Sequence, residues 1–263
     1  LISNLVNSSG VVASNTSITG TAREYCQGAE YGGDKGIITY TNGADVTNLV
    51  SNQGVVASDT TGVGSNRNNP AATKYGLDKA IFGYGYTNAN VNLTNLVSNQ
   101  GVVGSDVTGV GTARRNAAGT GFGLTGEAIF GYGYSNTYSN ILNKVSSSGV
   151  VASDTTAAGT GNVSRGAAMY GSTGQAIFAY GETGGGVTAI SNLCSNTGVV
   201  SSDVSAVGTA RMYGAMSAYG GDKAIFAFGT DSSSKLNVSN KINNVGTVAS
   251  DTSGVGTARS GLA

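Results

Sequence analysis

The sequence predicts an all-β fold built from one repeated unit of short strands. The apolar and aromatic motif KAIFGYG at residues 79–85 has close copies that begin at residues 35, 127, 175 and 223, so successive copies start 44 or 48 residues apart. A fixed period of this length indicates an array of a single supersecondary unit. Glycine interrupts every apolar run and no 3.6-residue periodicity is sustained, which argues against helices.

Residues 67–114 show the strands expected in one unit. The four apolar runs are AATKY, KAIFGYG, VNLTNLV and GVVGSDV, and the residues between them are Gly, Asn, Asp, Ser, Thr and Gln, most of which favour turns. Four strands in about 48 residues are typical of a propeller blade. We therefore predict a β-propeller of four-stranded blades, in which each KAIFGYG copy is the inner strand of one blade. A β-solenoid, whose rungs are usually shorter, is the alternative.

The KAIFGYG motif can be buried on both sides. Ala80, Phe82 and Tyr84 point to one face of a strand and Ile81 and Gly83 to the other. A strand held between neighbouring blades needs this pattern. The repeated aromatics are therefore predicted core residues: Phe82, Phe130, Phe178 and Phe226.

A second motif, Gly-Val-Val or Gly-Thr-Val, keeps the same step but occurs six times, beginning at Gly10, Gly54, Gly101, Gly149, Gly198 and Gly246. We expect one domain over residues 1–263, with outer strands of a half-repeat at 1–21 and the start of a further repeat at 259–263. The full repeats are 22–66, 67–113, 114–164, 165–210 and 211–258. Either five blades close with an extra half, which we favour, or a sixth blade is completed elsewhere, and a chain that begins in mid-repeat reads as a processed product, a domain or a fragment.

Composition excludes several function classes. Only 11% of residues are charged, the formal net charge is zero and 43 residues are glycine, so no basic patch is available for nucleic acid. No run of about 18 apolar residues predicts membrane insertion. Histidine is absent, which removes the commonest general base and any His/Cys zinc cluster. Cys26 and Cys194 occupy non-equivalent repeat positions and are too few for a disulfide framework.

Five aspartates recur at one repeat position, ahead of an arginine. The pairs are Asp59 and Arg67, Asp106 and Arg114, Asp154 and Arg165, Asp203 and Arg211, and Asp251 and Arg259. We expect structural ion pairs that tie the last strand of one unit to the first strand of the next. A row of ligand sites is the alternative. Paired carboxylates act in glycosidases built on propellers, but an active site needs an asymmetric cluster, so we predict no enzyme, no cofactor and no metal site.

The segments that follow the glycine-ended strand differ most between repeats: 86–92, 134–140, 182–188 and 230–237. In a four-stranded blade these loops emerge on one face, together with the connections between blades. Tyrosine supplies flat apolar area and a hydroxyl suited to sugars or proteins. The candidate partner contacts are Tyr86, Tyr134, Tyr138, Glu182 and Asp231. The alternative is that the tyrosines cap the hydrophobic ends of the blades.

The unit resembles kelch-like repeats, with an arginine near its start, a small-residue strand such as AAGTGFG, a turn, and a strand ending in glycine such as AIFGYG. It departs from them in having Gly-Tyr-Gly or Ala-Tyr-Gly for the double glycine and no tryptophan. The phrasing NLVSNQGVVASDTTGVG is also similar to repeats in bacteriophage virion and tail-appendage proteins, including tail fibres. This resemblance implies an extracellular or virion-associated adhesion module whose partners are other protein subunits of a particle. A soluble lectin-like propeller that binds cell-surface glycans is the alternative.

Overall fold

The computed structural model describes residues 2–23, 25–40, 45–254 and 256–262. Within these ranges the chain forms strands and turns and no helix, so the prediction of an all-β fold is confirmed. Every strand pair is antiparallel, and the strands belong to several small sheets.

Five sheets carry most of the structure, and their strands follow chain order. The first has β3 (Gln27–Tyr31), β4 (Lys35–Thr39), β5 (Val46–Val50) and β6 (Thr60–Thr61). The second has β7 (Ala71–Tyr75), β8 (Lys79–Gly83) and β9 (Thr94–Val97). The third has β10 (Ala118–Phe122), β11 (Glu127–Gly131), β12 (Ile141–Val145) and β13 (Thr155–Thr156). The fourth has β14 (Gly166–Tyr170), β15 (Gln175–Ala179) and β18 (Ser191–Cys194), and the fifth has β19 (Ala215–Tyr219), β20 (Lys223–Ala227) and β21 (Ser239–Ile242). Two two-residue pairs complete the set, β1 (Ile2–Ser3) with β2 (Thr16–Ser17) and β16 (Glu182–Thr183) with β17 (Gly186–Val187).

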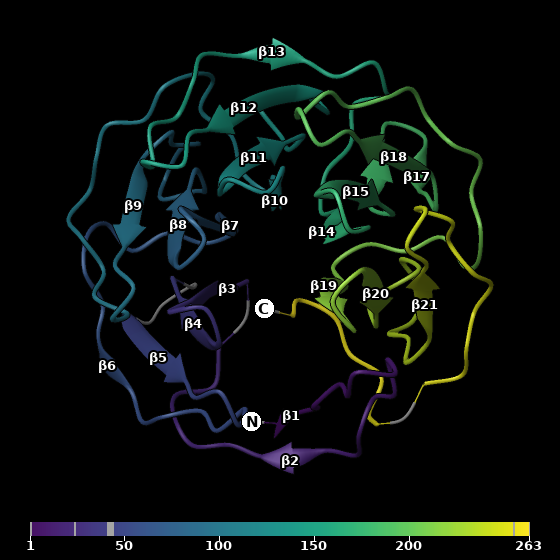
Figure 1. Ribbon diagram of the computed structural model, residues 1–263, viewed down its shortest axis with the longest axis horizontal. Coiled ribbons are helices and arrows are strands. Elements are labelled where there is room, and N and C mark those ends of the chain that lie inside the picture. Colours follow the sequence, from purple (N-terminus) through teal and green to yellow (C-terminus); the bar gives the residue numbers. More distant parts are fainter. Residues whose placement is uncertain (1, 24, 41–44, 255, 263) are drawn as a thin grey trace.

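Figure 1 shows these sheets arranged in a ring, with the first strand of each sheet nearest the centre. Each first strand packs on that of the next sheet, in the order β3, β7, β10, β14 and β19. The hydrophobic clusters lie between consecutive sheets; one of them joins Tyr75 and Ile81 to Ala128 and Phe130. The repeated Phe82, Phe130, Phe178 and Phe226 are all fully buried, as expected for core residues.

The KAIFGYG motif forms the second strand of each sheet, so the prediction that it is the inner strand is wrong. The small-residue strand, for example AGTGF in β10, occupies the inner position. Small side chains suit that place because the sheets converge there: a Cβ on Gly119 would lie 2.5 Å from the Ala72 carbonyl oxygen of the neighbouring sheet. The motif strand also ends early, since Tyr84 has φ of 63° and turns the chain out of the sheet.

The predicted fourth strand is mostly absent. In the second sheet the segment GVVGSDV at 101–107 makes only isolated bridges, Val97 with Val103 and Thr94 with Val107. Here the Asn95 side chain donates a hydrogen bond to the Gly104 carbonyl at 3.0 Å. Backbone bonds from the Gly104 N–H to Leu96 and between Thr94 and Val107 also hold the segment, so it stays close to the sheet without the continuous pairing of a strand.

Backbone hydrogen bonds join neighbouring units near the centre of the ring. Asn69, Asn116, Ser164, Tyr213 and Gly261 each donate from N–H to the carbonyl of the equivalent residue one unit earlier, at 2.9–3.4 Å. A second series joins the turns after the first strands, through Gly32 to Asp78, Gly76 to Gly126, Gly123 to Gly174 and Gly171 to Asp222. The first series runs from Tyr25 to Gly261 and so continues past the fifth sheet.

Candidate functional site

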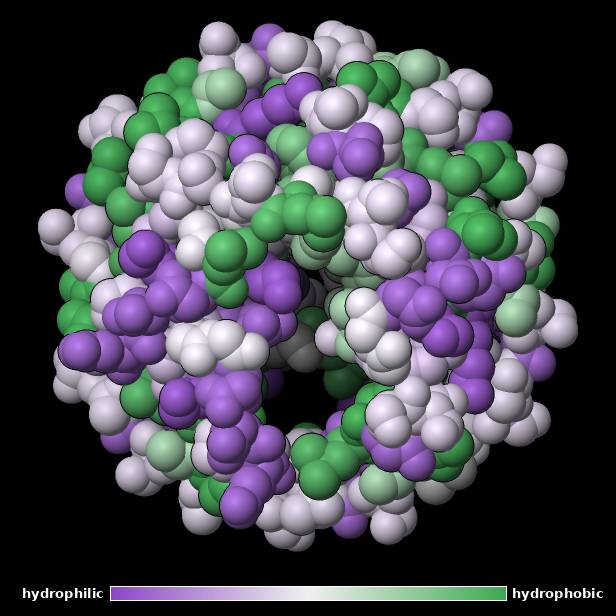
Figure 2. Space-filling model, viewed as in Figure 1, coloured by the Kyte–Doolittle hydropathy of each residue, from purple (hydrophilic) through white to green (hydrophobic). Residues whose placement is uncertain are grey.

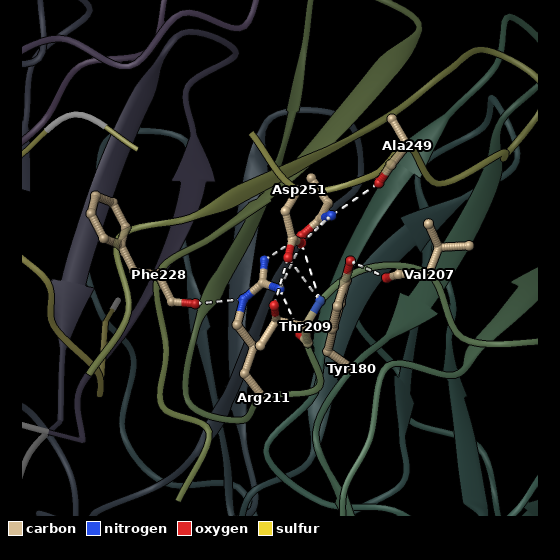
Figure 3. A network of polar contacts seen from close by, with 8 residues as sticks. Tyr180, Val207, Thr209, Arg211, Phe228, Ala249 and Asp251 are labelled. Carbon is tan, nitrogen blue, oxygen red and sulfur yellow. Dashed lines mark hydrogen bonds and ion pairs between the residues drawn. The ribbon is translucent and has the colours of Figure 1, made fainter. Parts of the chain in front are cut away.

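The repeated aspartates and arginines form one polar network per unit, shown for Arg211 in Figure 3. The Asp251 carboxylate accepts hydrogen bonds from the Thr209 N–H and hydroxyl and from the Asn240 amide, and it lies 3.8 Å from Arg211. Arg211 donates from Nε to the Phe228 carbonyl at 2.9 Å and through a terminal nitrogen to Asn240. Its guanidinium also lies over the Tyr180 ring of the preceding unit. Hydrogen bonds, an ion pair and a ring contact together fix the position of the Arg211 guanidinium.

The prediction paired the repeated aspartates with the wrong arginines. Asp59 contacts Arg23 and not Arg67, Asp106 contacts Arg67 and not Arg114, and Asp251 contacts Arg211 and not Arg259. Asp154 and Asp203 bind Thr112 and Thr160, beside Arg114 and Arg165. The chain returns along each sheet, so its outer segment meets the start of the same unit. Each network therefore ties the outer segment of one repeat to its own first arginine and to the Ser or Thr at the end of the repeat before it.

The surroundings of the aspartates favour their charged form. Partial burial opposes ionisation of Asp106, Asp154, Asp203 and Asp251, but hydrogen bonds from hydroxyl, amide and backbone donors outweigh it, so the pKa of each lies below its ordinary value. Burial lowers the pKa of Arg67, Arg114 and Arg211, and it lowers that of Arg165 to about 10. These groups are structural charges.

The remaining reactive groups do not assemble into a chemical site in the described part of the chain. No group of three His, Cys, Asp or Glu residues there has metal-binding geometry. Cys26 and Cys194 are both buried and free, and burial raises the pKa of the Cys194 thiol to about 12. A thiol with such a pKa is a weak nucleophile.

Four of the five predicted contact residues come together around Arg115 on loops of three consecutive units. The Arg115 guanidinium lies 4.9 Å from the centre of the Tyr86 ring and 4.8 Å from that of Tyr134. Tyr138 packs edge-on against Tyr134 with ring centres 5.9 Å apart, and its hydroxyl donates to the Glu182 carboxylate at 3.2 Å. We call Tyr86, Arg115, Tyr134, Tyr138 and Glu182 the tyrosine–arginine cluster.

Backbone pairing fixes this cluster in place. Tyr86 exchanges two backbone hydrogen bonds with Asn68, at 2.9 and 3.0 Å, and Tyr134 does the same with Arg115. The loop after each second strand is thereby tied to the segment that enters the first strand. The Arg115 side chain also donates to Asn90 at 3.2 Å. All five cluster residues are half-buried, so the cluster is part of the protein surface and not of the hydrophobic core.

Asp231, the fifth predicted contact, does not join the cluster. Its carboxylate accepts hydrogen bonds from Ser233 N–H, Ser233 hydroxyl and Ser234 N–H within its own loop. The Ser233 hydroxyl is the main cause of the lowered pKa of Asp231. This acid shapes a turn.

Arg115 is the residue that the sequence analysis missed. It directly follows the repeated Arg114, whereas the equivalent positions, which pair with Tyr86, Glu182 and Thr230, hold Asn68, Val163 and Met212. A charge that breaks the repeat pattern beside variable tyrosine loops was the available signal.

The cluster suits contact with protein better than stacking on a sugar. Arg115 already covers one face of Tyr86 and one face of Tyr134, so these rings offer less free area for a pyranose. Tyrosine and arginine held rigidly at a half-exposed surface are the residues enriched in protein interfaces. Arg115 and Glu182 carry opposite charges, so the cluster has no formal net charge.

The sequence matches no protein-family model and no curated protein. The described residues include no helix that is long and apolar enough to cross a membrane. The functional proposal therefore depends on the geometry above and on the repeats.

Proposed function

We propose that this chain is a non-catalytic β-propeller module of an extracellular assembly and that it binds another protein through the tyrosine–arginine cluster. The observation that carries the proposal is the position of Arg115 between Tyr86 and Tyr134, which come from two neighbouring units. Each ring belongs to a different loop, so the cluster presents one continuous surface across adjacent blades.

The radial arrangement in Figure 1 supports the propeller part of the proposal, with first strands at the centre and later strands outward. The use of the repeated charges supports a structural role. Asp59, Asp106, Asp154, Asp203 and Asp251 all accept hydrogen bonds from backbone N–H groups of the chain itself. A repeated ligand site would need such groups to be free.

The setting we propose is the one that the repeat phrasing implies, a bacteriophage virion or tail appendage, with other protein subunits of the particle as partners. The first test is mass spectrometry of extracellular particles separated on a density gradient. Peptides of this chain that follow the particle fractions support the proposal, and their recovery only as free protein contradicts it.

The second test concerns the cluster. Purified labelled chain is titrated onto those particles, and we expect Arg115→Ala to weaken binding by about tenfold or more, as for an interface hot spot. The matched control is Met212→Ala, because Met212 pairs with Thr230 as Arg115 pairs with Tyr134. Equal affinity of the two variants contradicts the cluster as the contact. Saturable binding of free glycans at several equivalent sites supports the lectin reading instead.

A further inference from the structure

One sector of the ring lacks the two inner strands that fill the others. Among the residues that the structure describes, only β1, β2 and the C-terminal segment lie between β19 and β3 (Figure 1). Figure 2 shows a hollow on this side of the ring, between its centre and the position of β1. A cavity of about 800 Å³ opens there, and Val6, Ala218, Ile225 and Arg259 are among the residues that line it. We call this region the open sector.

The outer part of the open sector is built as in every other unit. Asn4 donates to the Ala13 carbonyl and accepts from Arg259, as Asn143 donates to Ala152 and accepts from Arg114. The Tyr219 ring lies against Gly10 as the Tyr31 ring lies against Gly101. The interface that joins neighbouring sheets therefore continues on the rim, and only the inner part of the sector is empty of strands.

Apolar residues are exposed where that inner part would cover them. Val6 is 42% exposed, whereas its equivalents Val97, Val145 and Ile242 are 0% exposed. Those three residues pair with Ala80, Ala128 and Ala224 of the second strands. On the opposite wall Ser217 of β19 is exposed, while its equivalents Thr73 and Thr120 are buried.

Polar groups in the open sector lack the partners that their equivalents have. Arg67, Arg114 and Arg211 donate from Nε to the carbonyls of Tyr84, Tyr132 and Phe228 at 2.7–2.9 Å. The buried Nε of Arg259 has no hydrogen-bond partner. The Nε of Arg165 in a filled unit has none either, but there a terminal nitrogen donates to the Phe178 and Ile190 carbonyls instead. The Gly171 N–H donates to Asp222 in the next turn, but the Gly220 N–H has no such backbone partner among the described residues.

Aromatic contacts show the same gap. The guanidinium groups of Arg67, Arg114, Arg165, Arg211 and Arg259 each lie over an aromatic ring of the preceding unit, at 3.9–4.4 Å from its centre. Arg23, which borders the open sector, has no such ring among the described residues, and its terminal nitrogen Nη1 is buried without a hydrogen-bond partner. One aromatic residue in the sector would supply a ring for Arg23 and a carbonyl for Arg259.

We propose that the open sector binds a two-stranded β-hairpin of the repeat type. Its first strand has small residues and ends in an aromatic that packs near Gly54, as Tyr31 packs on Gly101. Its second strand has the pattern Ala-Ile-Phe-Gly-Tyr, with the alanine opposite Val6 and the tyrosine between Arg259 and Arg23. Binding adds strands to existing sheet edges and buries the exposed apolar wall. The bound hairpin completes a sixth unit of the ring, whether or not the tyrosine–arginine cluster binds protein.

The probe is the peptide with the sequence of residues 117–133, AAGTGFGLTGEAIFGYG, joined to a soluble carrier. We expect one peptide to bind per chain by isothermal titration calorimetry, with added protection of β19 amides from hydrogen exchange. The same peptide with Phe130→Asp should bind about tenfold more weakly or not at all, because it would bury a charge without a partner. No binding, or equal binding of both peptides, overturns the proposal.

Variants of the protein locate the site. Val6→Asp places a charge on the exposed wall and should abolish peptide binding while the chain stays folded by circular dichroism. Val102→Asp is the matched control, since Val102 is 63% exposed on the outer rim of a filled unit. Equal loss in both variants contradicts the open sector as the site. A dimer of this chain that depends on Val6 and excludes the peptide would show that a second copy, and not a hairpin of the repeat type, fills the sector.

Discussion

Arg259 donates a hydrogen bond to the side chain of Asn4, 255 residues earlier in the chain. The bond repeats the contact of Arg114 with Asn143 inside a filled unit. Asn15 takes the place of the aspartate in this unit: its side-chain oxygen accepts from Asn4 and its amide donates to Thr257. The two ends of the chain thus complete one network of the kind that holds each other unit together.

Removal of an aspartate from a complete network should be costly. For Asp251→Ala we expect the free energy of unfolding to fall by about 3 kcal/mol, because Thr209 and Asn240 lose a charged acceptor and Arg211 is left buried without its carboxylate. Chemical denaturation measures the change. Asp231→Ala, which only opens a surface turn, is the control and should have a small effect; equal effects would contradict the structural role.

The glycine beside each network is required for close approach. Gly208 has φ of 80°, and a Cβ there would lie 2.3 Å from Asp251 Oδ1 and 2.6 Å from Asn240 Nδ2. Gly221 has φ of 87° with nothing within 4 Å, so Gly221→Ala reports backbone strain alone, about 1 kcal/mol. Gly208→Ala should lower the free energy of unfolding by about 3 kcal/mol, since overpacking adds to the strain. Denaturation midpoints that agree for the two variants would show that the network tolerates a methyl group.

Acid should weaken the fold through the same carboxylates. The pKa values of Asp106, Asp154, Asp203 and Asp251 are lower in the folded chain than their ordinary value. The unfolded chain therefore takes up protons first as the pH falls below about 4, and the stabilisation present above that pH is lost towards the folded-state values. Melting temperatures between pH 6 and pH 2 test this. The wild type should lose more stability than Asp251→Asn, and parallel curves would contradict the assignment.

The packing between sheets should be sensitive at the glycine of the second strand. A Cβ on Gly83 would lie 3.1 Å from the Phe130 ring of the next sheet, so Gly83→Val should cost about 1–3 kcal/mol by overpacking. Thr87→Val, in the exposed loop that follows, is the control and should change stability by about 0.5 kcal/mol or less. A thermal melt that ranks the two variants in the opposite order would show that the sheets are not in close contact there.

The sequence predicts some levels of this structure better than others. Period and composition were enough for strands at AATKY and KAIFGYG, because local turn chemistry brackets both runs. They were not enough for GVVGSDV, where pairing is confined to isolated bridges and the Asn95 side chain bonds to Gly104 between them. The partners of Asp106 could not be predicted from the sequence either. They depend on the path of the chain along the sheet, which brings Asp106 beside Arg67.

The same limit applies to the candidate site. Tyr86, Tyr134 and Tyr138 were visible as aromatics that break the repeat, but no spacing rule places Arg115 between two of them. That contact exists because neighbouring units stand side by side in the ring.

Hydrogen exchange at residues 2–6 in Arg259→Ala tests most directly whether the two ends of the chain are joined. We expect faster exchange at the N-terminal segment in this variant, because Arg259 holds Asn4 from the other end of the chain. Arg115→Ala, which leaves the termini untouched, should exchange there like the wild type. Unchanged exchange at residues 2–6 in Arg259→Ala would mean that the two ends do not close the ring.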